Sequence, residues 1–260
     1  VLLKWESLLF RKYNLIYVIN GKEGYMKEFL KKSASALSIE LTDEMLEKFQ
    51  IYFDFLLETN KSLNLTAITE MKDVVLKHFV DSISIVSYFD LKDKKVIDVG
   101  TGAGFPGIPL AILNPDTEFV LADSLKKRLH FIDQVTEKCD LKNVTTVHGR
   151  AEDLGQDTMY RERFDYCVSR AVASLPVLLE LCIPFVKQNG YFISYKSETL
   201  QQELGQAKHA MQELNCSLYQ EYSYTLPETD YYRVLAAFSK NGPLKKKYPR
   251  QAGKPKRNPL

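Results

Sequence analysis

Cysteine is scarce in this sequence, and its spacing suits neither a metal site nor a disulfide framework. The 260 residues contain four cysteines and no C-x-x-C pair; they are Cys139, Cys167, Cys182 and Cys216. All four lie in segments with the pattern of buried helix or strand, where reduced thiols are usual in cytosolic proteins. We therefore expect no disulfide bond, no metal site and a cytoplasmic location.

A long apolar run is also missing from the first 25 residues. Lys4, Glu6, Arg11 and Lys12 interrupt the apolar beginning, which stays below the roughly 18 apolar residues that span a membrane. A secretory signal would need charges ahead of an unbroken apolar segment and small residues after it. Neither is present, so we expect no membrane partner. Because a cleaner globular pattern opens at Met26, we interpret residues 1–25 as a leader that is disordered or not native.

Acidic residues are absent from the last thirty positions. Residues 231–260 hold nine lysines and arginines, whereas residues 1–230 hold 26 basic and 33 acidic side chains. The net charge of +2 therefore conceals an acidic body and a strongly basic end. Clustered cations bind polyanions partly by releasing condensed counterions, so this polarity indicates a polyanionic partner. A solvated, solubilising tail is the alternative.

The remaining composition is that of an ordinary globular protein. Hydrophobic residues make up 45% and charged residues 26% of the chain, which argues against a collagen-like or largely disordered protein. The length allows one large domain or a domain with an appendage.

Residues 26–92 show helical periodicity. Thr42 is a candidate N-cap, and Leu46, Phe49 and Phe53 fall on one face of the helix that would follow it. A second amphipathic stretch follows around residues 75–86. We expect this part to form a small helical subdomain or cap.

After Lys95 the pattern changes to short β-branched runs that alternate with longer helical stretches, which is typical of β-α-β units around a parallel sheet. We expect strands near 95–99, 118–123, 144–148, 164–169 and 190–195, and helices near 107–113, 125–139, 175–187 and 198–214. Two further runs, 217–225 and 231–239, follow each other without a helix and predict an antiparallel pair.

The predicted fold is therefore α/β, with a Rossmann-like sheet that is parallel except for an antiparallel terminal pair, preceded by the small helical subdomain. The expected division is a leader at 1–25, a helical cap at 26–92, the α/β domain at 93–242 and a basic C-terminal tail at 243–260. Because proline, glycine and lysine dominate after Asn241, we expect that tail to be mobile.

The first expected strand leads into a glycine-rich loop. Val99 is followed by Gly-Thr-Gly-Ala-Gly-Phe-Pro-Gly over residues 100–107. Glycines allow the backbone to turn sharply and to approach a ligand closely. A purely structural turn needs only one or two of them, so four in eight residues favour a cofactor cradle.

Two cofactors are compatible with this loop. Residues 102–107 spell G-x-G-x-x-G, and Asp123 lies 21 residues after Gly102, as in a dinucleotide site; an NAD-dependent oxidoreductase is thus one hypothesis. Asp98, however, precedes Gly100 by two positions, and a carboxylate there would repel a pyrophosphate. S-adenosylmethionine has a sulfonium, an ammonium and a ribose diol but no phosphate. Charge therefore favours this methyl donor, with Asp98 assisting its cationic end and Asp123 accepting from its ribose hydroxyls.

Three more positions fall at the carboxyl edge of the expected sheet, where such sheets bind ligands. Ala151 and Glu152 follow the third strand, where an adenine edge would be met, and Arg170 follows the fourth. Structural alternatives exist: Arg170 as an exposed structural arginine, and Asp123 or Ser124 as the N-cap of the next helix. Capping and ligand binding are compatible roles.

At these residues the sequence resembles the RsmG or GidB family of bacterial small-subunit ribosomal RNA guanine methyltransferases. The likeness covers roughly residues 26–260. The matching stretches are Asn64-Leu65-Thr66-Ala67-Ile68, His78-Phe79-Val80-Asp81-Ser82, Asp98 through Pro109, Lys127-Arg128, Gly149-Arg150-Ala151-Glu152, Ser169-Arg170-Ala171-Val172-Ala173, the strand with Arg233, and Tyr248-Pro249-Arg250 with its basic sequel. Only the leader departs from the family, whose members start near Met26.

The resemblance implies a cytoplasmic S-adenosyl-L-methionine-dependent enzyme whose α/β domain methylates nitrogen-7 of a guanine in 16S ribosomal RNA. It also implies that the donor contacts Gly100, Phe105, Asp123, Ser124, Leu125, Ala151, Glu152 and Arg170; the loop adds Gly102 and Asp98 as candidates. Nitrogen-7 carries a lone pair and no proton, so we expect no general base, and catalysis is mostly placement. A noncatalytic RNA-binding module is a second alternative.

Candidates for holding the target base are Asn64, Thr66, Arg170 and Lys196, whereas His78 is interpreted as a structural histidine. Phosphate contacts would come from the basic end, namely Lys245, Lys246, Lys247, Arg250, Lys254, Lys256 and Arg257. The expected partner is small-subunit ribosomal RNA or the small ribosomal subunit, with no obligate protein partner evident.

Overall fold

The computed structural model describes residues 24–170 and 173–260 of the chain. The predicted leader therefore lies outside the described residues except for its last two, and so do Ala171 and Val172 of the Ser-Arg-Ala-Val-Ala motif. Residues 24–35 are helical.

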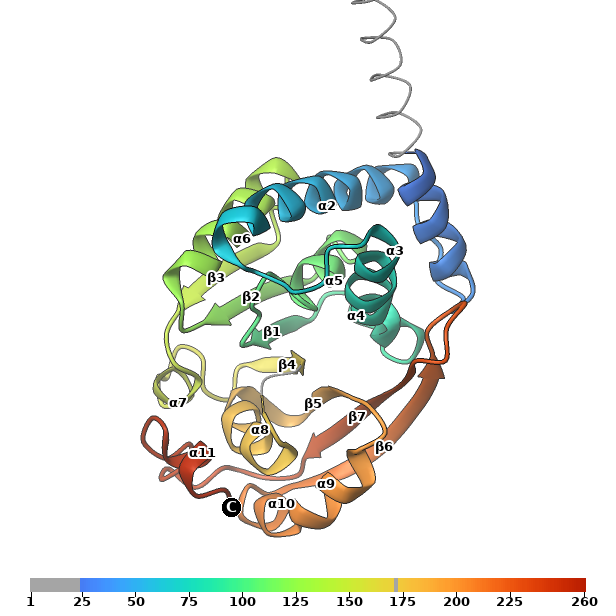
Figure 1. Ribbon diagram of the computed structural model, residues 1–260. Helices are drawn as coiled ribbons and strands as arrows, with labels where there is room; N and C mark the ends of the chain where they lie inside the picture. The colour runs from blue at the N-terminus through green and yellow to red at the C-terminus, as the bar shows by residue number, and fades with distance from the viewer. Residues whose placement is uncertain (1–23, 171–172) are drawn as a thin grey trace, which may run out of the picture.

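A seven-stranded sheet with the order β3-β2-β1-β4-β5-β7-β6 forms the centre of the molecule (Figure 1). The first five strands pair in parallel, and β7 pairs antiparallel with both β5 and β6. Their bounds are β1 (Lys95–Val99), β2 (Glu118–Asp123), β3 (Val144–His148), β4 (Phe164–Arg170), β5 (Val186–Lys196), β6 (Cys216–Thr225) and β7 (Tyr232–Lys240). This confirms the predicted α/β sheet with its antiparallel terminal pair.

Helices cover both faces of this sheet. On one face, α2 (Asp43–Leu63) packs on α5 (Gly107–Leu113) and α6 (Lys126–Lys138). The helical stretch of residues 71–87 lies beside α5 and consists of α3 (Met71–Val74), the π-helical η1 (Val75–Val80), α4 (Asp81–Ile83) and the 3-10 turn η2 (Ser84–Ser87). The other face carries α8 (Leu175–Cys182), the 3-10 turn η3 (Ile183–Phe185), α9 (Leu200–Gln206) and α10 (Lys208–Glu213), with α7 (Ala151–Leu154) and α11 (Lys254–Arg257) beside α8.

The N-terminal helices share one hydrophobic core with the sheet. Phe49 and Phe79 from these helices are fully buried in the same cluster as Phe131 of α6 and Ile193 of β5. The Thr42 hydroxyl accepts a hydrogen bond from the amide of Met45, which confirms the predicted N-cap of α2. The boundary between a cap and an α/β domain stays a prediction, because the N-terminal helices share their hydrophobic core with the sheet.

Two expected helices differ in detail from those observed. The stretch expected near 175–187 ends as a helix at Cys182, and β5 already begins at Val186. The stretch expected near 198–214 is divided between α9 and α10. In the first stretch an apolar run with helical spacing continues past the point where the chain turns, so periodicity alone placed the end too late. In the second stretch the predicted end is close to the observed one, and only the break at Ala207 was not predicted.

The C-terminal segment is packed, and the expectation of a mobile tail was wrong. Leu244 and Tyr248 are buried. Arg250 forms a bidentate ion pair with Glu180 of α8, with Nε–Oε1 and Nη2–Oε2 distances of 2.8 and 2.5 Å. Because Glu180 is fully buried, its charge needs this partner. Composition predicted a solvated segment because it does not show such specific anchors.

None of the helices in the described part of the chain is long and apolar enough to cross a membrane. The four cysteines are buried free thiols.

Candidate functional site

The glycine-rich loop leaves β1 at the point where the strand order reverses between β1 and β4, which is where open α/β sheets bind ligands. Gly100, Gly102 and Gly104 have φ angles of 74°, 62° and 97°, a region that residues with a side chain rarely adopt. At Gly104 an added Cβ would also lie 2.7 Å from Ile108 and 3.0 Å from the hydroxyl of Tyr52. The loop therefore turns without side chains that would obstruct a ligand.

An N-terminal helix holds this loop in place. The buried Tyr52 hydroxyl of α2 donates to the carbonyl oxygen of Ala103 at 2.5 Å. The Tyr52 ring also stacks on Phe105, with centroids 5.3 Å apart. The helices ahead of the sheet thus fix the conformation of the ligand loop as well as covering the core.

Asp98 does not reach the site, which corrects its predicted contact with the cofactor. Its side chain is fully buried under the loop, and Oδ2 accepts from the amide of Gly107 at 2.9 Å. Burial raises the pKa of Asp98 to about 7. Oδ1 has no hydrogen-bond partner among the described residues. The acid therefore supports the start of α5, and its position two residues ahead of the glycines did not identify a ligand contact.

Asp123 lies at the end of β2 and lines the cavity. Oδ2 accepts from the amide of Gly102 at 3.0 Å and from Arg128 at 3.3 Å, and Oδ1 accepts from the amide of Leu125 at 2.9 Å. A carboxylate has about four acceptor sites, so one remains for a ligand hydroxyl. The N-cap position of α6 belongs to Leu125, so neither Asp123 nor Ser124 caps this helix as proposed.

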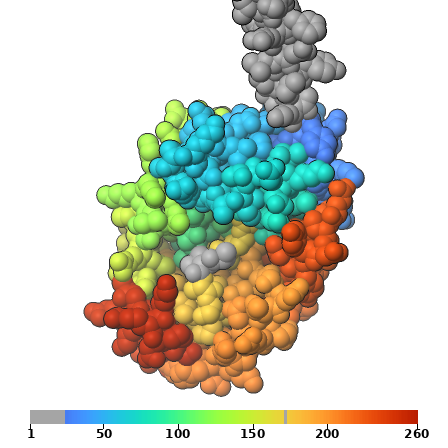
Figure 2. All heavy atoms as spheres, viewed as in Figure 1, coloured from blue at the N-terminus to red at the C-terminus, as the bar shows by residue number. Residues whose placement is uncertain are grey.

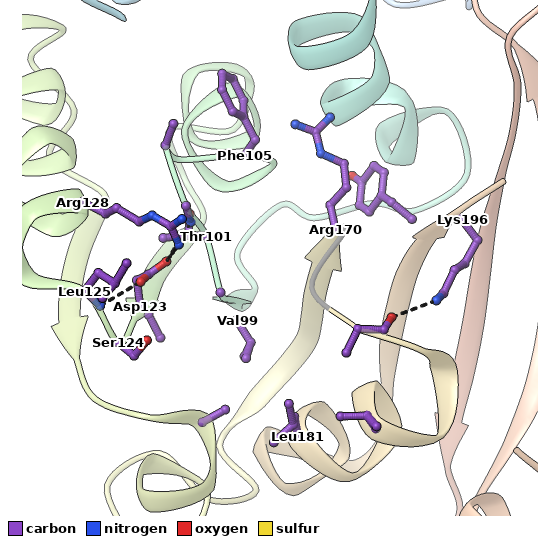
Figure 3. Close-up of a pocket in the computed structure, with 18 of the residues that line it drawn as sticks. Val99, Thr101, Phe105, Asp123, Ser124, Leu125, Arg128, Arg170, Leu181 and Lys196 are labelled. Carbon is purple, nitrogen blue, oxygen red and sulfur yellow. Dashed lines mark hydrogen bonds and ion pairs between the residues drawn. The ribbon is translucent and has the colours of Figure 1, made fainter. Parts of the chain in front are cut away.

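One cavity of about 1250 Å³ is lined by the residues predicted to bind S-adenosylmethionine and by residues of several other segments. Figure 3 shows Asp123, Ser124, Leu125 and Arg128 on one side and Lys196 on the opposite side, with Phe105 and Arg170 between them at the top of the view. The residues predicted to bind S-adenosylmethionine all line this cavity, except Asp98. They are Gly100, Gly102, Phe105, Asp123, Ser124, Leu125, Ala151, Glu152 and Arg170.

The C-terminal segment forms part of the cavity wall. Gly253, Pro255 and Lys256 line it, and the amide of Gly253 donates to Glu152 Oε1 at 2.8 Å. In Figure 2 the cyan N-terminal residues and the red C-terminal residues border the centre of the visible face from opposite sides.

Arg170 at the end of β4 is held by a buried network. Its Nη1 donates to Asp81 Oδ2 at 2.8 Å and to the carbonyl of Lys77 at 2.9 Å. Asp81 Oδ1 also accepts from Tyr224 at 2.9 Å and lies 3.4 Å from Arg233 Nε. Arg170 is thus no free surface arginine. Its guanidinium lies 5.3 Å from the centre of the Phe105 ring, which connects the network to the glycine loop.

The residues predicted to hold RNA are placed unequally. Thr66, Lys196 and Lys256 line the cavity, whereas Asn64, which ends α2 in a left-handed conformation, does not. Lys196 pairs with Glu203 at 2.7 Å. Lys245 and Lys247 both pair with Glu213, and Lys246 is exposed. Lys254, Lys256 and Arg257 belong to α11.

Arg250 is engaged in contacts within the protein. Its guanidinium is bound to the buried Glu180 and to the carbonyl of Asn258, so it anchors the segment and is not available as the phosphate contact that we predicted.

Several residues that line the cavity were not predicted from the sequence. Asp81, Arg128, Tyr195 and Arg233 line it together with the predicted residues. A signal for three of them was present, because Asp81, Arg128 and Arg233 fall in stretches that match the resembled family. Tyr195 has no such signal; it enters the site because β5 ends next to β4.

The residues present are compatible with S-adenosylmethionine. The loop offers backbone without obstructing side chains, Asp123 retains an acceptor site for a ribose hydroxyl, and the cavity is large enough for the donor. This fold and this site define the class of Rossmann-like methyltransferases. The fold is similar to that of the putative methyltransferase in a complex with the Haloferax volcanii Trm112 methyltransferase activator, with a TM-score of 0.53, 14% identity and coverage of 73% of this chain and 98% of that one.

The model of the family GidB, rRNA small subunit methyltransferase G, matches residues 45–226. The chain is 48% identical over 236 residues to "Ribosomal RNA small subunit methyltransferase G" of Alkaliphilus oremlandii, covering 90% of this chain and 99% of that protein. It is 46% identical to the protein of the same name from Acetivibrio thermocellus, over 93% of this chain and all of that protein. The chain therefore belongs to the small-subunit ribosomal RNA methyltransferase G family. This membership sets aside the NAD-dependent oxidoreductase and the noncatalytic module.

Proposed function

We propose that the protein transfers a methyl group from S-adenosylmethionine to nitrogen-7 of a guanine in 16S ribosomal RNA, and that it does so in the cytoplasm. The observation that carries the proposal is the composition of one cavity. It combines the glycine loop and Asp123 with Thr66, Arg170 and Lys196. Its volume of about 1250 Å³ exceeds the roughly 300–1000 Å³ of a typical small-ligand site, so a base can enter beside the donor.

The donor side of the cavity is assigned to the residues nearest the strand ends. Gly100 and Gly102 present open backbone, and the Asp123 carboxylate accepts from the ribose hydroxyls. Ala151 and Glu152 lie after β3, beside the position expected for adenine, with Ser124 and Leu125 on the neighbouring turn. Phe105, Arg170 and Thr66 line the same cavity.

The reaction does not require a side chain to remove a proton from the base. The donor supplies an electrophilic methyl group on its sulfonium. Guanine nitrogen-7 has an in-plane lone pair and no proton, so the side chains need only orient the base and exclude water. Burial and the neighbouring Arg170 lower the pKa of His78 to about 3, which keeps this imidazole uncharged at neutral pH.

The RNA side is assigned to the cations around the cavity mouth. Lys256 lines the cavity, and Lys245, Lys246, Lys247, Lys254 and Arg257 extend the positive charge along the C-terminal segment. These side chains would bind phosphates without reading sequence. A guanine in an RNA loop can be turned out of its stack and bound in the cavity.

The test is methyl transfer to small ribosomal subunits that lack the modification. With radiolabelled S-adenosylmethionine, we expect label in the small-subunit RNA and none in large subunits. Equilibrium binding should give a complex with S-adenosylmethionine and none with NAD. Binding of the donor without transfer to any ribosomal particle would contradict the proposed substrate.

A further inference from the structure

A chain of three hydrogen-bonded side chains runs from the network of Arg170 to the base side of the cavity. Arg170 Nη2 lies 3.3 Å from His78 Nδ1, and His78 Nε2 lies 2.8 Å from Thr66 Oγ1. His78 is stacked on Phe105, with ring centroids 4.5 Å apart and planes 18° apart. It belongs to the π-helical η1, an irregularity that is frequent at functional sites.

The chemistry of arginine fixes the proton position on His78. A guanidinium only donates hydrogen bonds, so Nδ1 must accept and carries no proton. A neutral imidazole then has its hydrogen on Nε2. Nε2 therefore donates to the Thr66 hydroxyl oxygen.

The Thr66 oxygen is thereby saturated as an acceptor. It also accepts from the amide of Ile68 at 3.0 Å, so both of its lone pairs are occupied and its own hydrogen remains to be donated. No acceptor for that hydrogen is recorded among residues 24–170 and 173–260. The residue is also fixed in position, because the side-chain amide of Asn60 bonds both the amide and the carbonyl of Thr66 at 2.9 Å. Since Thr66 lines the cavity, it offers a ligand an oriented donor.

We propose that the Thr66 hydroxyl donates to the 6-oxygen of the target guanine, and that Arg170 and His78 act as positioning residues that keep it a donor. The inference rests on the proposed function. The edge of guanine that carries nitrogen-7 presents two acceptors, N7 and O6, whereas adenine presents an amino donor beside N7. N7 must keep its lone pair for the methyl group, so the hydroxyl pairs with O6. A hydroxyl group that can donate a hydrogen bond but cannot accept one selects guanine and rejects adenine.

Thr66→Val and Thr66→Ser form the matched test of the hydroxyl. Valine has a similar shape but no hydroxyl, and we expect it to slow single-turnover methylation of small subunits roughly fivefold, the value of one neutral hydrogen bond. Serine restores the hydroxyl and should recover most of the lost rate. Affinity for S-adenosylmethionine should stay unchanged in both variants. The thermal midpoint should fall in Thr66→Val, because His78 Nε2–H and the Ile68 amide lose their acceptor, and should recover in Thr66→Ser. Methylation is therefore compared at a temperature at which both variants are folded, which separates loss of positioning from loss of folding. A Thr66→Val enzyme as fast as the unmodified protein would overturn the proposal.

A double-mutant cycle tests whether His78 acts through Thr66. His78→Phe retains stacking on Phe105 and removes the hydrogen bond. It should slow methylation in the unmodified protein and have little further effect in Thr66→Val, because the two changes break one chain. Full additivity would contradict the relay. The ¹⁵N shifts of His78 give an independent readout without RNA: we expect a protonated Nε2 and an unprotonated Nδ1, and the reverse tautomer would overturn the assignment.

The partner atom is tested with subunits that carry 2-aminopurine at the target position, since this base retains nitrogen-7 and lacks the 6-oxygen. Single-turnover rates with excess enzyme should drop for the unmodified protein, and Thr66→Val should cause no additional loss on this substrate. If Thr66→Val slows both substrates by the same factor, O6 is not the partner. Failure of the unmodified protein to methylate normal subunits would instead contradict the proposed function.

Discussion

The amide of Gly253 donates a hydrogen bond to the carboxylate of Glu152, with the nitrogen and Oε1 2.8 Å apart. This contact joins α7, beside the expected adenine position, to the C-terminal segment. The cavity is therefore closed on one side by residues that the sequence presents as a basic tail, since Gly253, Pro255 and Lys256 all line it.

Removal of residues 251–260 should lower the affinity for S-adenosylmethionine as well as that for RNA. We expect a loss of roughly 10- to 100-fold in donor affinity, because Glu152 loses a hydrogen bond to a charged group worth about 1.5–3 kcal/mol and part of the wall is lost. Calorimetric titration measures it. Glu152→Gln retains an oxygen acceptor for Gly253 and should lose less than Glu152→Ala. A truncated protein with full donor affinity and weakened RNA binding would show that the segment serves RNA alone.

Arg250→Ala should destabilise the protein by about 3–5 kcal/mol, because it leaves the buried carboxylate of Glu180 without its partner. Urea unfolding provides the measurement. Lys247→Ala is the control: its side chain is 61% exposed in the pair with Glu213, and exposed pairs contribute about 0–1 kcal/mol. Unchanged stability and reduced RNA affinity of Arg250→Ala would contradict the anchoring role and support Arg250 as a phosphate contact.

Asp98→Asn should change how stability depends on pH. Burial raises the pKa of Asp98 to about 7, so between about pH 4 and 7 the folded state holds a proton that the unfolded state has lost. The stability that this carboxyl contributes is full below pH 4 and is lost as the pH rises through 7. Relative to Asp98→Asn, which does not titrate, the unmodified protein should therefore lose about 3 kcal/mol between pH 5 and 8. Urea unfolding of both proteins at these two pH values tests it, and a constant difference would refute the raised pKa.

Asp123→Asn should weaken S-adenosylmethionine binding by roughly 10- to 100-fold, the range for losing a hydrogen bond to a charged acceptor. The carboxylate both orients the amide of Gly102 and retains a site for a ribose hydroxyl. The exposed Asp116→Asn, in the turn before β2, provides a control with the same change of charge. If both variants bind the donor equally well, Asp123 has no part in the donor site.

Much of the fold was accessible from the sequence because hydrophobic period and glycine placement are local signals. The strands expected near 95–99, 118–123 and 144–148 are observed with those bounds. The glycine loop and Asp123 were found in the same way, since a strand end followed by glycines is encoded in consecutive residues.

The remaining features depend on contacts between distant residues. Whether Asp98 faces a ligand or the start of α5 depends on how the loop folds back over it. The anchoring of Arg250 by Glu180 joins positions 70 residues apart, and no spacing rule predicts it. His78 was interpreted as a structural histidine, and its link to Thr66 becomes visible only when η1 is placed against the loop after α2.

The most direct measurement is the position of the methyl group. Small subunits from a strain without this modification would be incubated with the protein and S-adenosylmethionine, and their RNA would be cleaved chemically at N7-methylguanosine and sequenced. We expect one new cleavage site, at a guanine of 16S ribosomal RNA, that depends on both the protein and S-adenosylmethionine. Methyl groups found only on another atom or another base, or no transfer to this RNA, would contradict it.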